Sequence, residues 1–191
     1  MKSSTLELFW VEKIKLTQNT INLTRNLNDE QLDFPNDVAR LSIRKALQKM
    51  QINDQKFATY LPFAIRFGNL FPLPKVSQVE IEQELTMIRD LFQAPALPPK
   101  LSDIIVRSAD EIEFSECNPS LENIFKPWKQ AIGHQESHVE KISEEDSYKY
   151  RYFSWKGIYI IPAAINMVAM ENHFLLKDGI LKFLKDPNFP K

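Results

Sequence analysis

The residues IRKALQKMQINDQKFATYL, numbers 43–61, carry apolar side chains at the spacing of one face of an α-helix. The apolar members of this stripe are Ile43, Leu47, Met50, Phe57 and Leu61. Asp54 interrupts the stripe, and Ser42 precedes it as a residue that can cap a free backbone N–H. Pro62 follows, and a proline inside a helical pattern should bend or end the helix. We therefore expect an amphipathic helix that needs other elements to bury its apolar face.

Further helices are predicted on both sides of this segment. Residues 4–27, residues 77–92, a segment that begins at Ser120 and residues 160–184 all show helical spacing of apolar residues. In residues 4–27 the expected buried stripe is Leu6, Trp10, Ile14, Thr17 and Ile21. Pro127 and Gly133 predict a bend or a late start for the third long helix, whereas Pro162 suits the first turn of the last. Residues 101–114 fit either a short helix or coil, and residues 143–154 allow a short extended stretch.

These segments predict one all-α domain over residues 1–191. The simplest way to bury four long apolar stripes is an up-down four-helix bundle, here with one or two extra short helices and proline-rich loops. The chain has 4 glycines and 12 prolines, which suits long helices joined by stiff loops better than hairpins.

Charge and composition exclude several classes of partner. The chain has 24 Lys and Arg against 25 Asp and Glu, interleaved, so we expect no nucleic-acid partner. The most apolar stretch, residues 157–170, is too short to cross a bilayer, and we expect no membrane association. The lone cysteine, Cys117, and acidic residues early in the chain favour a cytoplasmic protein without a disulfide framework.

The three histidines are the clearest candidates for chemistry. His134 and His138 are four residues apart on one helix, so they share a side and suit two ligands of one metal if a third is within reach. His134 faces away from the apolar stripe of the helix and His138 borders that stripe, and we expect both to be solvated. His173 lies at the boundary of the most apolar helix. It fits either a hydrogen-bonded core histidine or a ligand or general base in the bundle centre. In the second case it would act with Glu171, Asn172 or Asp54 around a central pocket.

Two groups of residues resemble the DinB/YfiT-like helical-bundle superfamily. The first is Leu-Asn-Asp-Glu-Gln-Leu at residues 27–32, followed by Leu-Ser-Ile-Arg-Lys-Ala-Leu at residues 41–47. The second is Phe-Ser-Trp-Lys-Gly at residues 153–157, followed by the long apolar helix that contains His173. Leu41 stands where the family often has tryptophan. The resemblance spans most of the chain and implies the bundle predicted above.

The resemblance also implies where a metal centre would lie. Many members hold a divalent metal with one histidine from the second long helix and two, four residues apart, from the last. In this chain the first position falls on Lys49, and His173 pairs with either Lys177 or Ala169. The histidine triad is therefore degenerate, because a protonated lysine cannot coordinate a metal.

Two functions follow from this resemblance. The first is a bundle without a cofactor that binds a small molecule or forms a homodimer, and Lys49, Asp54, Asn172, Lys177 and Trp155 are the expected pocket residues. The alternative is a hydrolase or thiol transferase that uses a divalent metal such as zinc or nickel at a variant site around His173, with His173 and Glu171 as catalytic residues.

Overall fold

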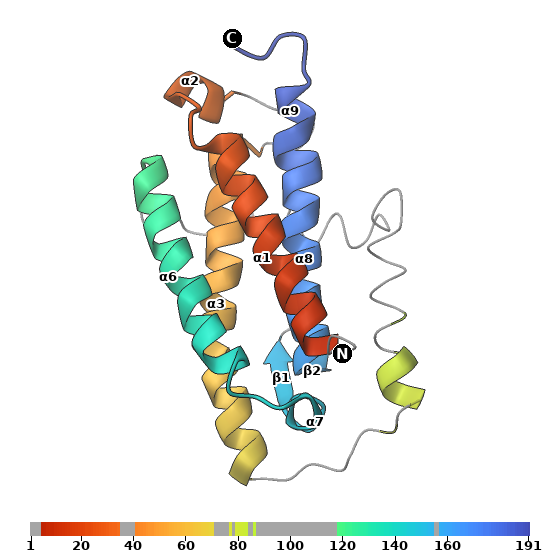
Figure 1. Cartoon of the computed structure of the whole chain (residues 1–191). Helices are drawn as coiled ribbons and strands as arrows, with labels where there is room; N and C mark the ends of the chain where they lie inside the picture. Colours follow the sequence, from red (N-terminus) through yellow and green to blue (C-terminus); the bar gives the residue numbers. More distant parts are fainter. Residues whose placement is uncertain are drawn as a thin grey trace.

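Four long helices form the body of the protein (Figure 1). The computed structural model describes residues 5–34, 41–70, 77, 79–83, 86, 118–154 and 157–191. The long helices are α1 (Thr5–Thr24), α3 (Ile43–Leu70), α6 (Leu121–Val139) and α8 (Ile161–Leu176). The short elements are α2 (Asp29–Leu32), α7 (Glu144–Ser147), β1 (Arg151–Ser154), β2 (Gly157–Ile160), the π-helix η1 (Lys177–Leu181) and α9 (Lys182–Leu184). The described part of the chain is thus mostly helical, as the sequence predicts.

The long helices do not alternate strictly in direction. Figure 1 shows α1 and α8 running one way, and α3 and α6 running the other. Contacts are most extensive between α3 and α6 and between α1 and α8, and α3 also packs against α8. The order up, down, down, up differs from a simple alternation. No helix among the described residues is both long and apolar enough to cross a lipid bilayer.

Most predicted helix boundaries agree with the structure. Ser120 caps α6, because its Oγ accepts a hydrogen bond from the Asn123 N–H at 3.3 Å, and Pro127 does not delay the start. The last helix continues through α8, η1 and α9 over residues 161–184. Pro62 does not end α3, which extends to Leu70. The buried side chains on either side of Pro62, Leu61 and Ala64, hold this part of α3 against the core.

The predicted face of α1 is partly wrong. Its buried residues are Leu6, Trp10, Lys13, Thr17, Thr20 and Thr24, whereas Ile14 and Ile21 are only partly buried. Each of the three threonine hydroxyls donates to the carbonyl oxygen four residues earlier, at 2.8–3.1 Å, so none needs a partner elsewhere. The buried face of α1 also includes a charged residue, Lys13, which is 0% exposed.

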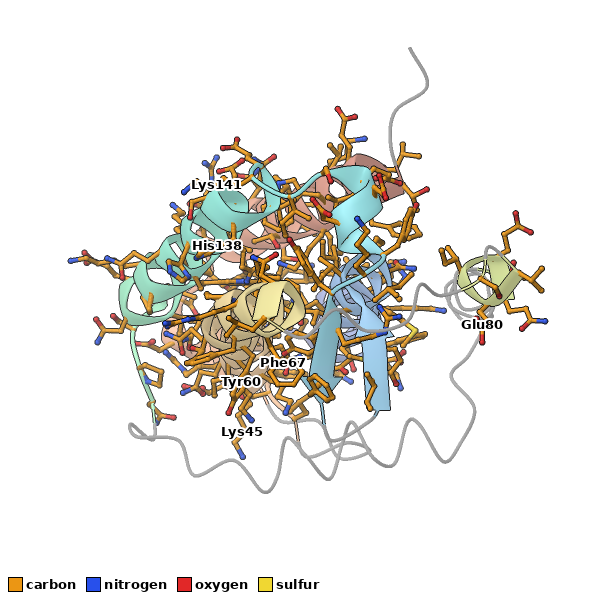
Figure 2. All side chains as sticks on the ribbon, turned by 90° about the horizontal axis from the view of Figure 1, so that it is seen from below. Lys45, Tyr60, Phe67, Glu80, His138 and Lys141 are labelled. Carbon is orange, nitrogen blue, oxygen red and sulfur yellow. The ribbon has the colours of Figure 1, made fainter. Side chains whose placement is uncertain are left out.

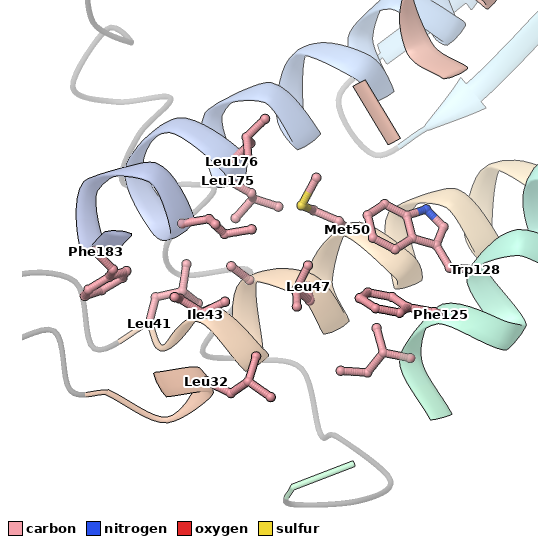
Figure 3. Close-up of a cluster of buried hydrophobic side chains, with 13 residues drawn as sticks. Leu32, Leu41, Ile43, Leu47, Met50, Phe125, Trp128, Leu175, Leu176 and Phe183 are labelled. Atoms are coloured by element: carbon pink, nitrogen blue, oxygen red, sulfur yellow. The ribbon is translucent and has the colours of Figure 1, made fainter. Parts of the chain in front are cut away.

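The apolar core is divided into two main clusters. The cluster in Figure 3 joins α3, α6 and the last helix through residues that include Leu47, Trp128 and Leu176. The second cluster surrounds Phe57 at the opposite end of the bundle and includes Leu6, Ile161 and Tyr152. Along α3, Asp54 lies between the two clusters, after Met50 and before Phe57.

A short β-hairpin closes the end of the bundle near the second cluster. The antiparallel register pairs Arg151 with Ile160 and Ser154 with Gly157. The extended stretch expected within residues 143–154 thus corresponds to β1, while the hairpin and α7 were not predicted. Tyr152 packs against Phe57, with ring centroids 5.0 Å apart. This contact fixes β1 against α3.

Candidate functional site

A buried polar network joins all four long helices around Asp54. The Asp54 carboxylate forms an ion pair with Lys13 of α1, and both side chains are 0% exposed. Trp128 of α6 donates its indole N–H to Oδ2 at 2.6 Å, and Asn172 of α8 donates to the same oxygen at 3.0 Å. Gln135 of α6 donates to Oδ1 at 3.2 Å and to the Asp54 carbonyl oxygen at 2.7 Å. Each helix therefore contributes a side chain to one carboxylate.

The network also satisfies the remaining polar atoms of these residues. Lys13 Nζ donates to Gln135 Oε1 at 2.8 Å, and Asn53 donates to Asn172 Oδ1 at 3.1 Å. Burial lowers the pKa of Lys13, while the charge and hydrogen bond of Asp54 act to raise it. A carboxylate that already accepts these bonds and is closed to solvent cannot serve as a general base for an external substrate. The network therefore has a structural role, because it connects the four helices and holds them in register.

The sequence did not predict this network. It named Asp54 and Asn172 as residues of a ligand pocket, whereas the structure joins them to each other by a buried hydrogen bond. Lys13, Trp128 and Gln135 were missed as members. The available signal was the spacing 6, 10, 13, 17, 20, 24 along α1, which places Lys13 at a helix position otherwise occupied by core residues.

Lys49 is buried on α3, with 6% of its surface exposed. It lies one helical turn before the partly buried Asn53, whose side chain reaches Asn172 of α8. Lys49 therefore occupies the boundary between α3 and α8, where the resemblance expects a metal ligand.

His173 and Glu171 are both half-buried on α8 but do not form a facing pair. Residues two apart on an α-helix project on different sides, whereas Lys177, four residues on, shares the side of His173. Burial lowers the pKa of His173, the positive charge of Lys177 lowers it further, and Asp178 opposes both effects. These effects together favour the neutral form of the imidazole.

His134 is exposed on α6, whereas His138 is partly buried, and their ring centroids lie 4.9 Å apart. Burial and the nearby charges of His134 and Lys141 lower the pKa of His138. Within the described ranges, no three or more His, Cys, Asp or Glu side chains gather in a way that could hold a metal ion. Trp155 and Cys117 lie outside the described residues.

The donor set at Lys49 and His173 does not suit the divalent metal that the resemblance implies. The matching positions supply the imidazole of His173, the amine of Lys49 and, depending on the register, either the amine of Lys177 or the methyl group of Ala169. Protonated amines have no lone pair to offer and repel a cation. We therefore assign no metal chemistry to these residues.

Arg44 belongs to residues 41–47 and connects this segment to the other part of the first motif, residues 27–32, and to the adjacent Asp33. Its side chain, 3% exposed, donates to both carboxylate oxygens of Asp33 at 2.7 and 2.8 Å and to Asp29 at 2.6 Å. It also donates to the Pro119 carbonyl oxygen at 2.7 Å, immediately before α6. These hydrogen bonds to the two aspartates raise the pKa of Arg44. The motif residues thus anchor α2 and the start of α6 to α3.

An open apolar groove lies at the other end of α3, beside β1. Its volume is about 500 Å³, and its lining consists of Tyr60, Phe63, Ala64, Arg66, Phe67, Leu70 and Phe153. Its aromatic side chains are 43–64% exposed. The predicted stripe of this helix ends at Leu61 and does not include Phe63 and Phe67, which lie on another face of α3.

Comparison with known protein families finds no family model that matches this chain, and comparison with curated proteins and with solved structures finds no match either.

Proposed function

We propose that this chain is a DinB-like helical bundle that binds a ligand without a metal centre. The observation that carries the proposal is Lys49, a buried lysine at the position where the resemblance expects a histidine ligand. An ammonium group there repels a divalent cation and leaves His173 without the partners that a three-histidine site requires. A binding role is the function best supported by this combination of residues.

The groove beside β1 supports the binding role directly. The Asp54 carboxylate is buried and already accepts an ion pair and hydrogen bonds from within the protein, so it is not accessible to a ligand. The groove instead offers exposed aromatic rings and a volume within the range of small-molecule sites, about 300–1,000 Å³. Exposed apolar surface gathered in one concave place is typical of a binding surface.

Metal titration tests the metal-independent part of the proposal. Isothermal titration calorimetry should detect no stoichiometric binding of zinc or nickel to the purified protein. A variant that carries Lys49→His and Lys177→His should bind zinc or nickel tightly, because it places imidazoles at all three positions of one of the two registers that the resemblance allows. The matched control carries Lys45→His and Lys177→His, since Lys45 is exposed four residues earlier on α3. One tightly bound metal per wild-type chain, lost on His173→Ala, would overturn the proposal.

The alternative function is a metal-dependent hydrolase or thiol transferase at a variant site around His173. One observation favours it, namely that burial lowers the pKa of His173 and shifts its imidazole toward the neutral form that binds metals. The same titration distinguishes the two functions. Only the metal-dependent enzyme requires the wild-type chain to bind a metal through His173.

A further inference from the structure

The groove beside β1 exposes an unusual amount of aromatic surface. Phe63 is 64% exposed and Leu70 is 67% exposed, although both lie on a helix whose opposite face is buried. Tyr60, Phe63, Phe67 and Leu70 follow one another at intervals of three and four residues, so they form one stripe along α3. Figure 2 shows Tyr60 and Phe67 on the same side of the molecule, away from His138 and Lys141. Phe153 of β1 supplies the facing wall, with its ring centroid 6.0 Å from that of Phe67.

The two chain segments that form the groove carry basic residues but no acidic ones. In the sequence, residues 56–70 and 151–160 contain no Asp or Glu, and their basic residues are Lys56, Arg66, Arg151 and Lys156. Arg66 lines the groove and is exposed. None of the ion pairs formed among the described residues involves Arg66. The groove therefore combines an apolar wall with a guanidinium group that is available to an external anion.

We propose that the groove binds a small aromatic carboxylate, whose ring system lies against the phenylalanines and whose anionic group pairs with Arg66. The inference rests on the proposed binding function and names its ligand class. Aromatic rings favour offset or edge-to-face contact with Phe63, Phe67 and Phe153. A guanidinium group matches the two oxygens of a carboxylate with parallel hydrogen bonds.

The same charge pattern argues against a second copy of the chain as the occupant. A symmetric dimer through this face would bring two copies of Arg66 together, and the adjoining residues 56–70 and 151–160 provide no carboxylate to neutralise them. An anionic small molecule removes this repulsion, whereas a neutral apolar molecule leaves Arg66 unused.

Calorimetric titration with 2-naphthoate and with its neutral counterpart 2-naphthamide tests the ligand class. The wild-type protein should bind the carboxylate about threefold to tenfold more tightly than the amide at low salt, as expected for one charged hydrogen-bonding pair near the surface. This preference should shrink at about 0.5 M sodium chloride, because salt screens an exposed charge pair. Arg66→Gln should abolish the preference while leaving amide affinity unchanged.

Two matched substitutions control for general effects. Arg25→Gln removes an exposed arginine immediately after α1, which ends near α2 at the end of the bundle opposite β1 (Figure 1), and should leave both affinities unchanged. Phe67→Ala should weaken both ligands at least threefold by removing part of the apolar wall, whereas Leu8→Ala, which truncates an exposed apolar side chain on α1, should not. Thermal unfolding of each variant verifies that it is folded.

The outcomes separate the ligand class from the underlying function. If Arg66→Gln keeps the preference for the carboxylate, the assignment of Arg66 is wrong, while weaker binding in Phe67→Ala still supports a binding groove. If the wild-type protein binds neither compound, both the ligand class and the groove as a small-molecule site are refuted. A wild-type dimer in sedimentation that becomes monomeric on Phe67→Ala would instead make the groove an interface between copies.

Discussion

Replacing Lys13 by methionine tests whether the buried network holds the bundle together. Methionine keeps most of the length of the lysine side chain but removes the ammonium group. Both members of the Lys13–Asp54 pair are 0% exposed, so the substitution leaves a carboxylate in the core without its counter-ion. Breaking a buried pair in this way costs about 3–5 kcal/mol.

The surrounding hydrogen bonds place the expected value at the lower end of this range. Trp128, Gln135 and Asn172 continue to donate to Asp54 after Lys13 is lost, and bonds to a charged group contribute about 1.5–3 kcal/mol each. We expect Lys13→Met to lower the free energy of unfolding by about 3 kcal/mol. Asp54→Asn should cost more, about 5 kcal/mol, because the new NH2 group faces hydrogen-bond donors whichever way the amide is turned, and the buried Lys13 loses its counter-ion.

Urea unfolding followed by tryptophan fluorescence measures these values. The double substitution of Lys13→Met with Asp54→Asn should cost about 2–3 kcal/mol less than the sum of the single changes, because the two residues interact directly. Lys15→Met is the matched control, since Lys15 pairs with Glu12 at the surface and is 67% exposed. It should change the free energy by less than about 1 kcal/mol. A Lys13→Met protein as stable as the wild type, or strictly additive effects, would refute a structural role for the network.

Further predictions concern backbone packing, the arginine anchor and pH. Gly68→Ala should lower the free energy of unfolding by about 1–3 kcal/mol, because the new methyl group would overlap the tyrosine ring of residue 150. Gly133→Ala should raise it by about 0.5–1 kcal/mol, because its Cβ meets nothing within 4 Å and alanine favours the helix; thermal unfolding compares the two. Arg44→Lys should cost about 2–3 kcal/mol in urea unfolding, although it keeps the charge, because lysine cannot bond two aspartates and a carbonyl oxygen together; an unchanged midpoint would contradict this. His173 has a pKa below its usual 6.5 in the folded protein, so the unfolded chain binds more protons and stability is lost as pH falls from 6.5 through the lowered pKa. His173→Gln should reduce this loss in unfolding experiments at pH 7 and 5, and Lys177→Gln should raise the pKa of His173 in an NMR titration.

Local patterns in the sequence were sufficient to predict the main helices. The stripe from Ile43 to Leu61 is buried as predicted, with each of its apolar members 0% exposed. The cap at Ser120 and the long last helix also follow from residues within a few positions of one another. Capping and periodicity act over one or two helical turns, so a single segment contains the information. The resemblance to DinB-like proteins stays a prediction, because no comparison tests it.

The identity of the buried face and the location of the candidate sites depended on contacts between distant segments. Lys13 is buried because Asp54, 41 positions later on another helix, supplies its counter-ion, and no local pattern reports that pairing. Phe63 and Phe67 remain exposed because the elements packed around α3 cover its opposite side. Helix formation follows from neighbouring residues, whereas burial is decided by whichever helix or strand lies across from a side chain, and that arrangement exists only in the folded protein.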